Sequence, residues 1–355
     1  MKVFMLIRSI QKGGASQNWI WVGETLADRG HDVVAMNYKQ NRDISVAENV
    51  KWIKRFDLDK KGFFAKLVSI RKEIKDSNAD VCISFLLDAN IFNILSCIGL
   101  KTKSIVCERN DPFKPGYWKL RLCKPLFRLA GGAVFQLQKV AEYYDNIKAP
   151  TAVIPNPVLF PPSITIKPAN KREDKICVIG RFDIFQKRND IMVDAFKMFS
   201  EKYSHYKLYF YGREGDENKV KNQVKLLGIE DKVFFPGFTF NPQEEMASAK
   251  MFVLTSDFEG IPNSLMDAMA LGLPCVATDC SPGGAALLIE DGVNGFLVPK
   301  GDTMAIAEKM KLIASEPELA DRLGFEAQKI LSRFSASDIG DKWNAYINNL
   351  IVNSQ

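Results

Sequence analysis

Short apolar runs alternate with amphipathic stretches along the chain, and this pattern predicts strands separated by helices. In the first half, KVFMLI, HDVVAM, ADVCISFL, KSIVCERN and GAVFQL have the character of buried strands. Between the first two runs lies the helical pattern NWIWVGETLADRG, which Gly30 is expected to end. Strands that alternate with helices form parallel βαβ units, and ligands of such sheets bind at the carboxyl ends of the strands. The pattern predicts the α/β fold class.

The alternation restarts after the proline-rich segment 154–168, IPNPVLFPPSITIKP, which has no periodic pattern and is the predicted interdomain linker. Beyond it, KICVIG, KLYFYG, VFFPGF, MFVLTS and PCVAT are predicted strands, again separated by helical patterns. We therefore expect two similarly built domains with a cleft between them. They comprise residues 1–157 and 170–335, and a C-terminal helix at about 337–352 is expected to pack back on the first domain.

The length and composition fit this division. The 355 residues exceed what one core usually serves, and 46% hydrophobic with 25% charged residues is typical of a soluble globular protein. The amino-terminal run VFMLI is too short for a signal peptide. The longest apolar stretch, 81–100, contains Asp88, Asn90 and Asn93, so we expect a buried strand and helix there instead of a membrane span.

Charge is distributed unevenly between the halves. Residues 1–165 have a net charge of +10 and the remainder −4, which together give the formal +6. Basic residues alternate with apolar ones in 60–75 and 113–132. Such stretches can rest on an anionic membrane surface, although ordinary surface helices have the same amphipathic pattern. Nucleic-acid binding is disfavoured because no recognised binding motif accompanies the basic residues.

The cysteines indicate neither a disulfide framework nor a metal site. Seven cysteines include no CxxC pair, and their odd number favours reduced thiols in the cytosol. Cys275 and Cys280 flank a predicted strand with no histidine nearby, so we expect no metal there.

The stretch FEGIPNSLMDAMALGLPCVATDC, residues 258–280, is the strongest candidate site. It follows the predicted strand MFVLTS, and its segment LMDAMALG has a helical pattern with Leu265 and Met269 facing inward and Gly272 as the stop. The loop between strand and helix therefore lies at a helix amino terminus, where free N–H groups and the macrodipole favour a phosphate. Gly260 lets the main chain approach a ligand, and Pro262 stiffens the loop.

Two acids flank this loop. Glu259 precedes the turn and can accept hydrogen bonds from sugar hydroxyls. Asp267 lies one turn inside the helix and can accept from ribose hydroxyls. For Asp267 a structural alternative stays open, because Ser264 and Asp267 have the spacing of a capping box.

These residues resemble a known family. FEGIPNSLMDAMALGLPCVATDCSPGG with LIEDGVNGFLVP is similar to the nucleotide-sugar site of the glycosyl transferases group 1, glycosyltransferase family 4. That family has the GT-B fold, in which two Rossmann-like parallel-sheet domains face each other across a cleft. IGRFDIFQKRNDIMVDAF, LYFYGREGDE, VFFPGF, AVIPNPV and the glycine-rich loop at 13–15 resemble further segments of the family.

Two departures from the family pattern affect the expected site. Asp267 stands where the family has a second glutamate. Many members have a histidine near the transferred sugar, but His31 and His205 both fall in connections between elements, so neither is expected to be catalytic. The end of the fourth predicted strand instead has the sequence CERNDP, which resembles a branch of the family with Arg and Asn there.

The resemblance implies a retaining hexosyltransferase that needs neither metal nor cofactor. It would move a hexose or N-acetylhexosamine from a nucleotide sugar, most commonly UDP-linked, to a saccharide or lipid-linked acceptor in surface polysaccharide or glycolipid biosynthesis. We expect it in the cytoplasm or at the inner face of the cell membrane, with membrane contact through the basic first domain. Glu259 would position the sugar, and Arg181 and Lys187 would neutralise the diphosphate leaving group.

The same resemblance implies a set of donor-binding residues. They are Gly13, Gly14, Arg109, Asn110, Phe238, Gly260, Ile261, Pro262, Asn263, Ser264, Leu265 and Asp267. Phe238 is nearly as well explained as a core residue, Asp111 is expected to line the cleft, and Gly283 and Gly284 shape a neighbouring loop. Two alternatives remain: a sugar-nucleotide epimerase of the same architecture, and a partner protein that binds nucleotide sugar without transferring it.

Overall fold

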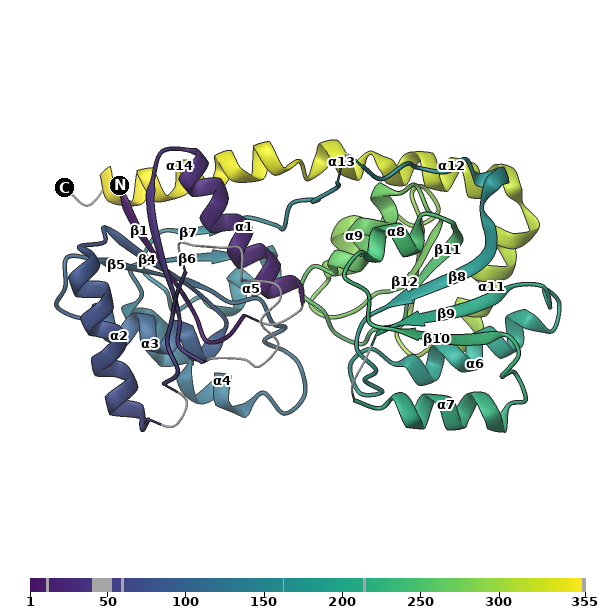
Figure 1. Ribbon diagram of the computed structural model, residues 1–355, viewed down its shortest axis with the longest axis horizontal. Coiled ribbons are helices and arrows are strands. Elements are labelled where there is room, and N and C mark those ends of the chain that lie inside the picture. The colour runs from purple at the N-terminus through teal and green to yellow at the C-terminus, as the bar shows by residue number, and fades with distance from the viewer. Residues whose placement is uncertain (11–12, 40–52, 59–60, 162, 213–214, 353–355) are drawn as a thin grey trace. The chain divides into compact units, whose positions relative to one another are not determined.

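The computed structural model describes residues 1–10, 13–39, 53–58, 61–161, 163–212 and 215–352. The chain divides into two compact units, of which unit 1 comprises Met1–Asn156 with Ala336–Gln355 and unit 2 comprises Pro157–Ser335. Each unit alternates strands and helices (Figure 1). Four residues of the segments named above, Lys60, Pro162, Arg213 and Glu214, lie outside the described residues.

Unit 1 contains a seven-stranded sheet in the order β3-β2-β1-β4-β5-β6-β7, with every neighbouring pair parallel. Its strands are β1 (Lys2–Ile7), β2 (Asp32–Asn37), β3 (Ile53–Arg55), β4 (Val81–Phe85), β5 (Lys103–Cys107), β6 (Gly132–Phe135) and β7 (Thr151–Val153). Its helices are α1 (Gly14–Asp28), α2 (Phe63–Ser77), α3 (Leu87–Cys97), α4 (Trp118–Cys123), the 3₁₀ helix η1 (Lys124–Leu129), α5 (Gln138–Tyr143) and α14 (Ala336–Val352).

Both faces of this sheet are covered, which explains why its strands are apolar without alternation. Successive residues of β1 point to opposite faces: Met5 packs with α1 and α14, whereas Phe4 packs with α2 and α3. Helix α14 is fixed to unit 1 by Trp343, which is 1% exposed, and by Arg29, whose Nη2 donates to Asp341 Oδ1 at 2.8 Å. The last helix of the chain therefore belongs to the core of unit 1.

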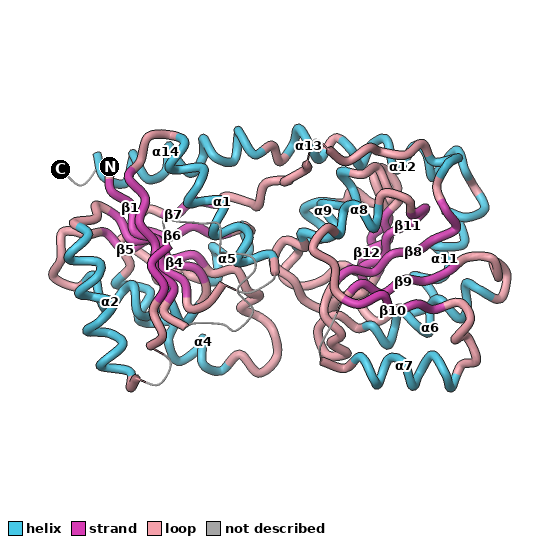
Figure 2. The backbone as a smooth tube through the Cα atoms, in the orientation of Figure 1, coloured by secondary structure: helices cyan, strands magenta, loops and turns pink. Residues whose placement is uncertain are grey.

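Unit 2 contains a six-stranded parallel sheet in the order β10-β9-β8-β11-β12-β13. Its strands (magenta in Figure 2) are β8 (Glu173–Ile179), β9 (Lys207–Tyr211), β10 (Val233–Gly237), β11 (Ala249–Leu254), β12 (Cys275–Thr278) and β13 (Phe296–Val298). Its helices are η2 (Ala169–Lys171), α6 (Asn189–Ser200), α7 (Glu217–Leu226), α8 (Pro242–Met246), α9 (Asn263–Ala270), α10 (Gly284–Leu288), α11 (Thr303–Ser315), α12 (Pro317–Gln328) and α13 (Ile330–Arg333).

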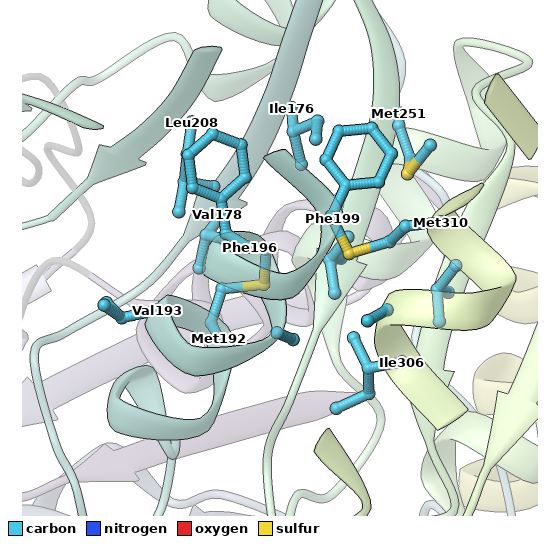
Figure 3. Close-up of a cluster of buried hydrophobic side chains, with 14 of the residues drawn as sticks. Ile176, Val178, Met192, Val193, Phe196, Phe199, Leu208, Met251, Ile306 and Met310 are labelled. Atoms are coloured by element: carbon cyan, nitrogen blue, oxygen red, sulfur yellow. The ribbon is translucent and has the colours of Figure 1, made fainter. Parts of the chain in front are cut away.

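One large apolar cluster holds this unit together. Phe196 and Phe199 of α6 pack with Ile176 of β8, Leu208 of β9 and Met310 of α11 (Figure 3). The side chains of α6 thereby cover one face of the sheet. The loops that build the candidate site follow the carboxyl ends of β8 and β11.

The predicted fold class is confirmed, with local differences. The single helix predicted over KLRLCKPLFRLAG is divided, since α4 ends at Cys123 and Pro125 lies in the first turn of η1. Proline has no N–H to donate and therefore stays near a helix start. The helix predicted over PQEEMASAK ends at Met246, because Ala249 already begins β11.

No described helix combines the length and the apolar character that crossing a bilayer requires.

Candidate functional site

The loop between β11 and α9 lies at the carboxyl edge of the unit 2 sheet, as predicted. Strand β11 is buried almost throughout and ends at Leu254, and α9 begins at Asn263. Leu265 and Met269 of α9 are fully buried, and Gly272 ends the helix with a positive φ of 67°. Within the loop, Ile261 and Pro262 are buried and give it a fixed shape.

Glu259 and Lys187 form an ion pair at this edge. Glu259 Oε1 accepts hydrogen bonds from Lys187 Nζ and from Ser256 Oγ, the latter at 2.8 Å. The side chains of Lys187 and Glu259 are only 18% and 12% exposed, so the pair is partly shielded from water. A Cβ at Gly180 would lie 3.2 Å from Lys187 Cε, so the glycine leaves room for the lysine stem. The structure thus brings two of the three predicted catalytic residues together.

Hydrogen bonds to backbone carbonyls hold the surrounding loops in place. Thr255 Oγ1 donates to the carbonyl of Lys187 at 2.8 Å, and the N–H of Glu259 donates to the carbonyl of Ser281 at 2.8 Å. A Cβ at Gly284 would lie 1.6 Å from the carbonyl oxygen of Gly260, a distance no side chain tolerates. The predicted role of Gly284 in shaping the neighbouring loop therefore has a direct steric reason.

Arg181, the third predicted catalytic residue, has other partners. Its Nη2 lies 3.3 Å from Asp183 Oδ2 and 3.0 Å from Gln186 Oε1. The side chain is 64% exposed, so this ion pair contributes little stability. Contact of Arg181 with a diphosphate stays a prediction that would require the guanidinium to exchange partners.

The amino terminus of α9 presents backbone donors to the same edge. Pro262 precedes the helix, and its carbonyl accepts from the N–H of Leu265 at 3.1 Å and of Met266 at 3.2 Å. The N–H of Leu265 is therefore already occupied, and its side chain is buried in the core. Ser264, one position earlier, has no intrahelical acceptor for its N–H, which suits it to a phosphate oxygen.

Asp267 does not form a capping box with Ser264, since the N-cap of α9 is Pro262 and Ser264 already lies inside the helix. Its Oδ1 instead accepts from Gln243 Nε2 of α8 at 2.8 Å. The aspartate is half-buried, and desolvation raises the pKa of its carboxyl from 3.8 to about 7, with the Gln243 bond acting in the opposite direction. The sequence did not predict the contact of Gln243 with Asp267, because Gln243 lies in a different helix that contains no motif.

This raised pKa predicts a pH-dependent affinity for donor. In the role predicted for Asp267, ribose hydroxyls bond most strongly to the ionised carboxylate, so the affinity for a UDP-hexose is expected to rise about tenfold between pH 6 and 8. Because the folded pKa lies above the unfolded value, the same group lowers the free energy of unfolding as the pH rises from about 4 to 7. Calorimetric titration without acceptor measures the affinity. An Asp267→Asn variant should show a flat profile, and a flat profile for the natural protein would contradict the assignment.

Phe238 is not a core residue. It follows β10 directly and is 38% exposed, and its ring packs edge-to-face against Phe240 at 5.1 Å between centroids. An exposed aromatic pair at a strand's carboxyl end is compatible with the predicted contact to a base.

The remaining predicted donor-binding residues belong to unit 1. Gly13 and Gly14 follow β1 and begin α1. Arg109 and Asn110 follow β5, and Arg109 is buried with its guanidinium 4.2 Å from the centre of the Phe85 ring.

The two histidines occupy the positions that the sequence indicated. His31 Nε2 pairs with Asn344 Oδ1 at 2.7 Å, and His205 lies in the connection between α6 and β9. Among the described residues, no group of three or more His, Cys, Asp or Glu is arranged to hold a metal ion.

Comparisons with known proteins identify a family, relatives and a shared fold. Residues 162–330 match the family described as glycosyl transferases group 1. A relative from Campylobacter jejuni, named GalNAc-alpha-(1->4)-GalNAc-alpha-(1->3)-diNAcBac-PP-undecaprenol alpha-1,4-N-acetyl-D-galactosaminyltransferase, is 28% identical over 97% of both chains. The lipopolysaccharide 1,6-galactosyltransferase of Escherichia coli is 31% identical over 46% of each chain.

Solved structures show the same fold. HepE from Anabaena, in complex with UDP and glucose, superposes with a TM-score of 0.84 at 19% identity and covers 98% of this chain and 100% of HepE. The predicted resemblance to the glycosyl transferases group 1 is thus confirmed for residues 162–330, which match that family, within a chain that has the GT-B fold.

Proposed function

We propose that the protein is a retaining glycosyltransferase that moves a hexose or N-acetylhexosamine from a UDP-sugar to a saccharide or lipid-linked acceptor in surface polysaccharide or glycolipid biosynthesis. The observation that carries this proposal is the shielded Lys187–Glu259 pair beside the amino terminus of α9. It joins a cation suited to a diphosphate with an acid suited to sugar hydroxyls. The complex of HepE with UDP and glucose and the undecaprenol-linked substrate in the Campylobacter name support the choice of donor and acceptor.

In the proposed reaction, the bond between the sugar's anomeric carbon and the diphosphate oxygen breaks, and the acceptor hydroxyl oxygen bonds to that carbon. The hydroxyl proton passes to the departing diphosphate. Lys187 stabilises the charge that develops on the leaving group, and Glu259 orients the sugar by accepting hydrogen bonds from its hydroxyls. No step needs a protein nucleophile or a metal ion.

A donor screen with product analysis tests the proposal. The protein is incubated with UDP-glucose, UDP-galactose and their N-acetylated forms, with and without undecaprenyl-diphosphate glycans. We expect transfer from one of these donors and an α-linked product, seen by the anomeric proton in NMR. An isomerised donor would identify an epimerase instead, and a stabilised protein without product would identify a binding partner.

The surface of unit 1 supports contact with the membrane that carries such acceptors. Helices α2 and α4 both attach to α3, through bonds from Arg71 to the Ser96 carbonyl and from Lys119 to Asp88. Outward-facing apolar side chains on these helices and on η1 are 58–78% exposed, namely Phe64, Val68, Trp118, Leu122 and Leu129. Neighbouring Lys and Arg residues give this surface a positive charge that suits an anionic bilayer.

Replacing Trp118 and Leu122 by Glu is expected to weaken binding to phosphatidylglycerol vesicles about tenfold, since it removes apolar insertion and adds negative charge. Cosedimentation measures the binding. Leu226, 87% exposed on unit 2, provides the matched control, and Leu226→Glu should bind as the natural protein does. An equal loss in both variants would contradict a membrane surface on unit 1.

A further inference from the structure

Glu108 is a buried acid to which the proposed reaction gives no part. It follows β5 directly, at the carboxyl edge of the unit 1 sheet, and is only 1% exposed. Acids are almost never buried to this degree without a partner or a task.

One oxygen of Glu108 organises the loop that follows. Its Oε1 accepts from the N–H of Arg109 at 3.1 Å, from the N–H of Asn110 at 3.0 Å and from Asn110 Nδ2 at 3.1 Å. The other oxygen, Oε2, is buried and has no hydrogen-bond partner among the described residues. The backbone of residues 109–110 and the side chain of Asn110 are therefore fixed by a single carboxyl oxygen.

Arg109 is fixed in turn. Its Nη1 donates to Asn156 Oδ1 at 3.2 Å, and the same oxygen accepts from Gln136 Nε2. Its Nε has no partner among the described residues, and burial lowers the pKa of the guanidinium. An ionised Glu108 beside it supplies the negative charge that a buried cation requires.

The surroundings of Glu108 place its titration near neutrality. Burial raises the pKa of its carboxyl to about 7, while the N–H groups of Asn110 and Arg109 and the charge of Lys114 act in the opposite direction. The other titratable groups that act on it electrostatically are Cys107, Arg109, Tyr117 and Tyr144.

We propose that Glu108 is a positioning residue, whose ionised carboxylate holds Arg109 and Asn110 in the arrangement that substrate binding at the β5 edge requires. The inference rests on the proposed function. A carboxylate bonds to the three N–H groups more strongly than a neutral acid does, so the loop is best ordered above pH 7. Substrate turnover depends on that order.

Glu108→Gln separates charge from shape, because its amide oxygen still accepts from the three N–H groups. We expect this variant to match the natural protein at pH 6 and to have a kcat/KM about tenfold lower at pH 8. Asp267 titrates in both proteins, so the ratio of their rates reports Glu108 alone. Affinity for UDP, bound by unit 2, should stay unchanged, and Glu108→Ala should be slow at both pH values. A ratio that does not change with pH would overturn the inference.

A second measurement decides the matter without turnover. The amide proton shifts of Arg109 and Asn110 should titrate with a midpoint near pH 7 in the natural protein and stay constant in Glu108→Gln. If no donor is turned over, the proposed function fails, and these shifts still test the inference. Amide shifts that do not titrate would overturn it even in an active enzyme.

Discussion

Glu259→Ala is expected to lower kcat for sugar transfer by about 10³-fold. The change removes the proposed acceptor for the sugar hydroxyls and also releases Lys187, whose Nζ donates to Glu259 Oε1. Asp267→Glu should retain most of the activity, because the longer side chain still presents a carboxylate to ribose. Initial transfer rates at saturating donor measure both effects.

Glu259→Gln serves as the matched control for this prediction. Its amide oxygen can still accept from Ser256 Oγ, but the charge that attracts Lys187 is lost. We expect an intermediate rate and an unchanged melting temperature. Equal losses in Glu259→Ala and Asp267→Glu would overturn the division of roles between the two acids.

Lys187→Ala is expected to lower kcat by about 10²-fold to 10³-fold, since it removes the shielded cation that the proposed reaction places at the leaving group. Lys187→Met keeps most of the side-chain volume beside Gly180 and should be as slow as Lys187→Ala. Equal rates in the two variants would show that the loss comes from the missing charge and not from altered packing. Single-turnover rates with preformed donor complex report the chemical step.

Arg181→Ala provides the comparison within the same site. Arg181 is 64% exposed and paired with Asp183, so we expect a loss of about tenfold, smaller than for Lys187. A larger loss in Arg181→Ala than in Lys187→Ala would show that the guanidinium, after leaving Asp183, is the main cation at the diphosphate.

The architecture could be predicted because it depends on local patterns. Apolar runs and helical periodicity define most elements, and Gly30 and Gly272 end α1 and α9 with positive φ values of 84° and 67°. The strands β3 and β13, three residues each, are too short to produce a pattern. Pro125 is visible in the sequence, but whether it bends or divides a helix depends on packing in three dimensions.

The sequence predicts a residue of the candidate site only where that residue lies within a recognisable motif. Glu259 and Gly260 lie in one loop, whereas Gln243 reaches Asp267 from a separate helix. Glu108 is the single acid of the strand-like run KSIVCERN, and nothing in the sequence separates a buried positioning acid from an exposed one. Burial and hydrogen-bond partners are set by the tertiary structure, so the sequence could predict neither the role of Gln243 nor that of Glu108.

The most direct test of the central claim is a crystal structure of the protein with a bound UDP-hexose. We expect the diphosphate to contact Lys187 Nζ and the N–H of Ser264, and the hexose hydroxyls to donate to Glu259. A donor bound away from the carboxyl edge of the unit 2 sheet, with Glu259 turned into solvent, would contradict the account.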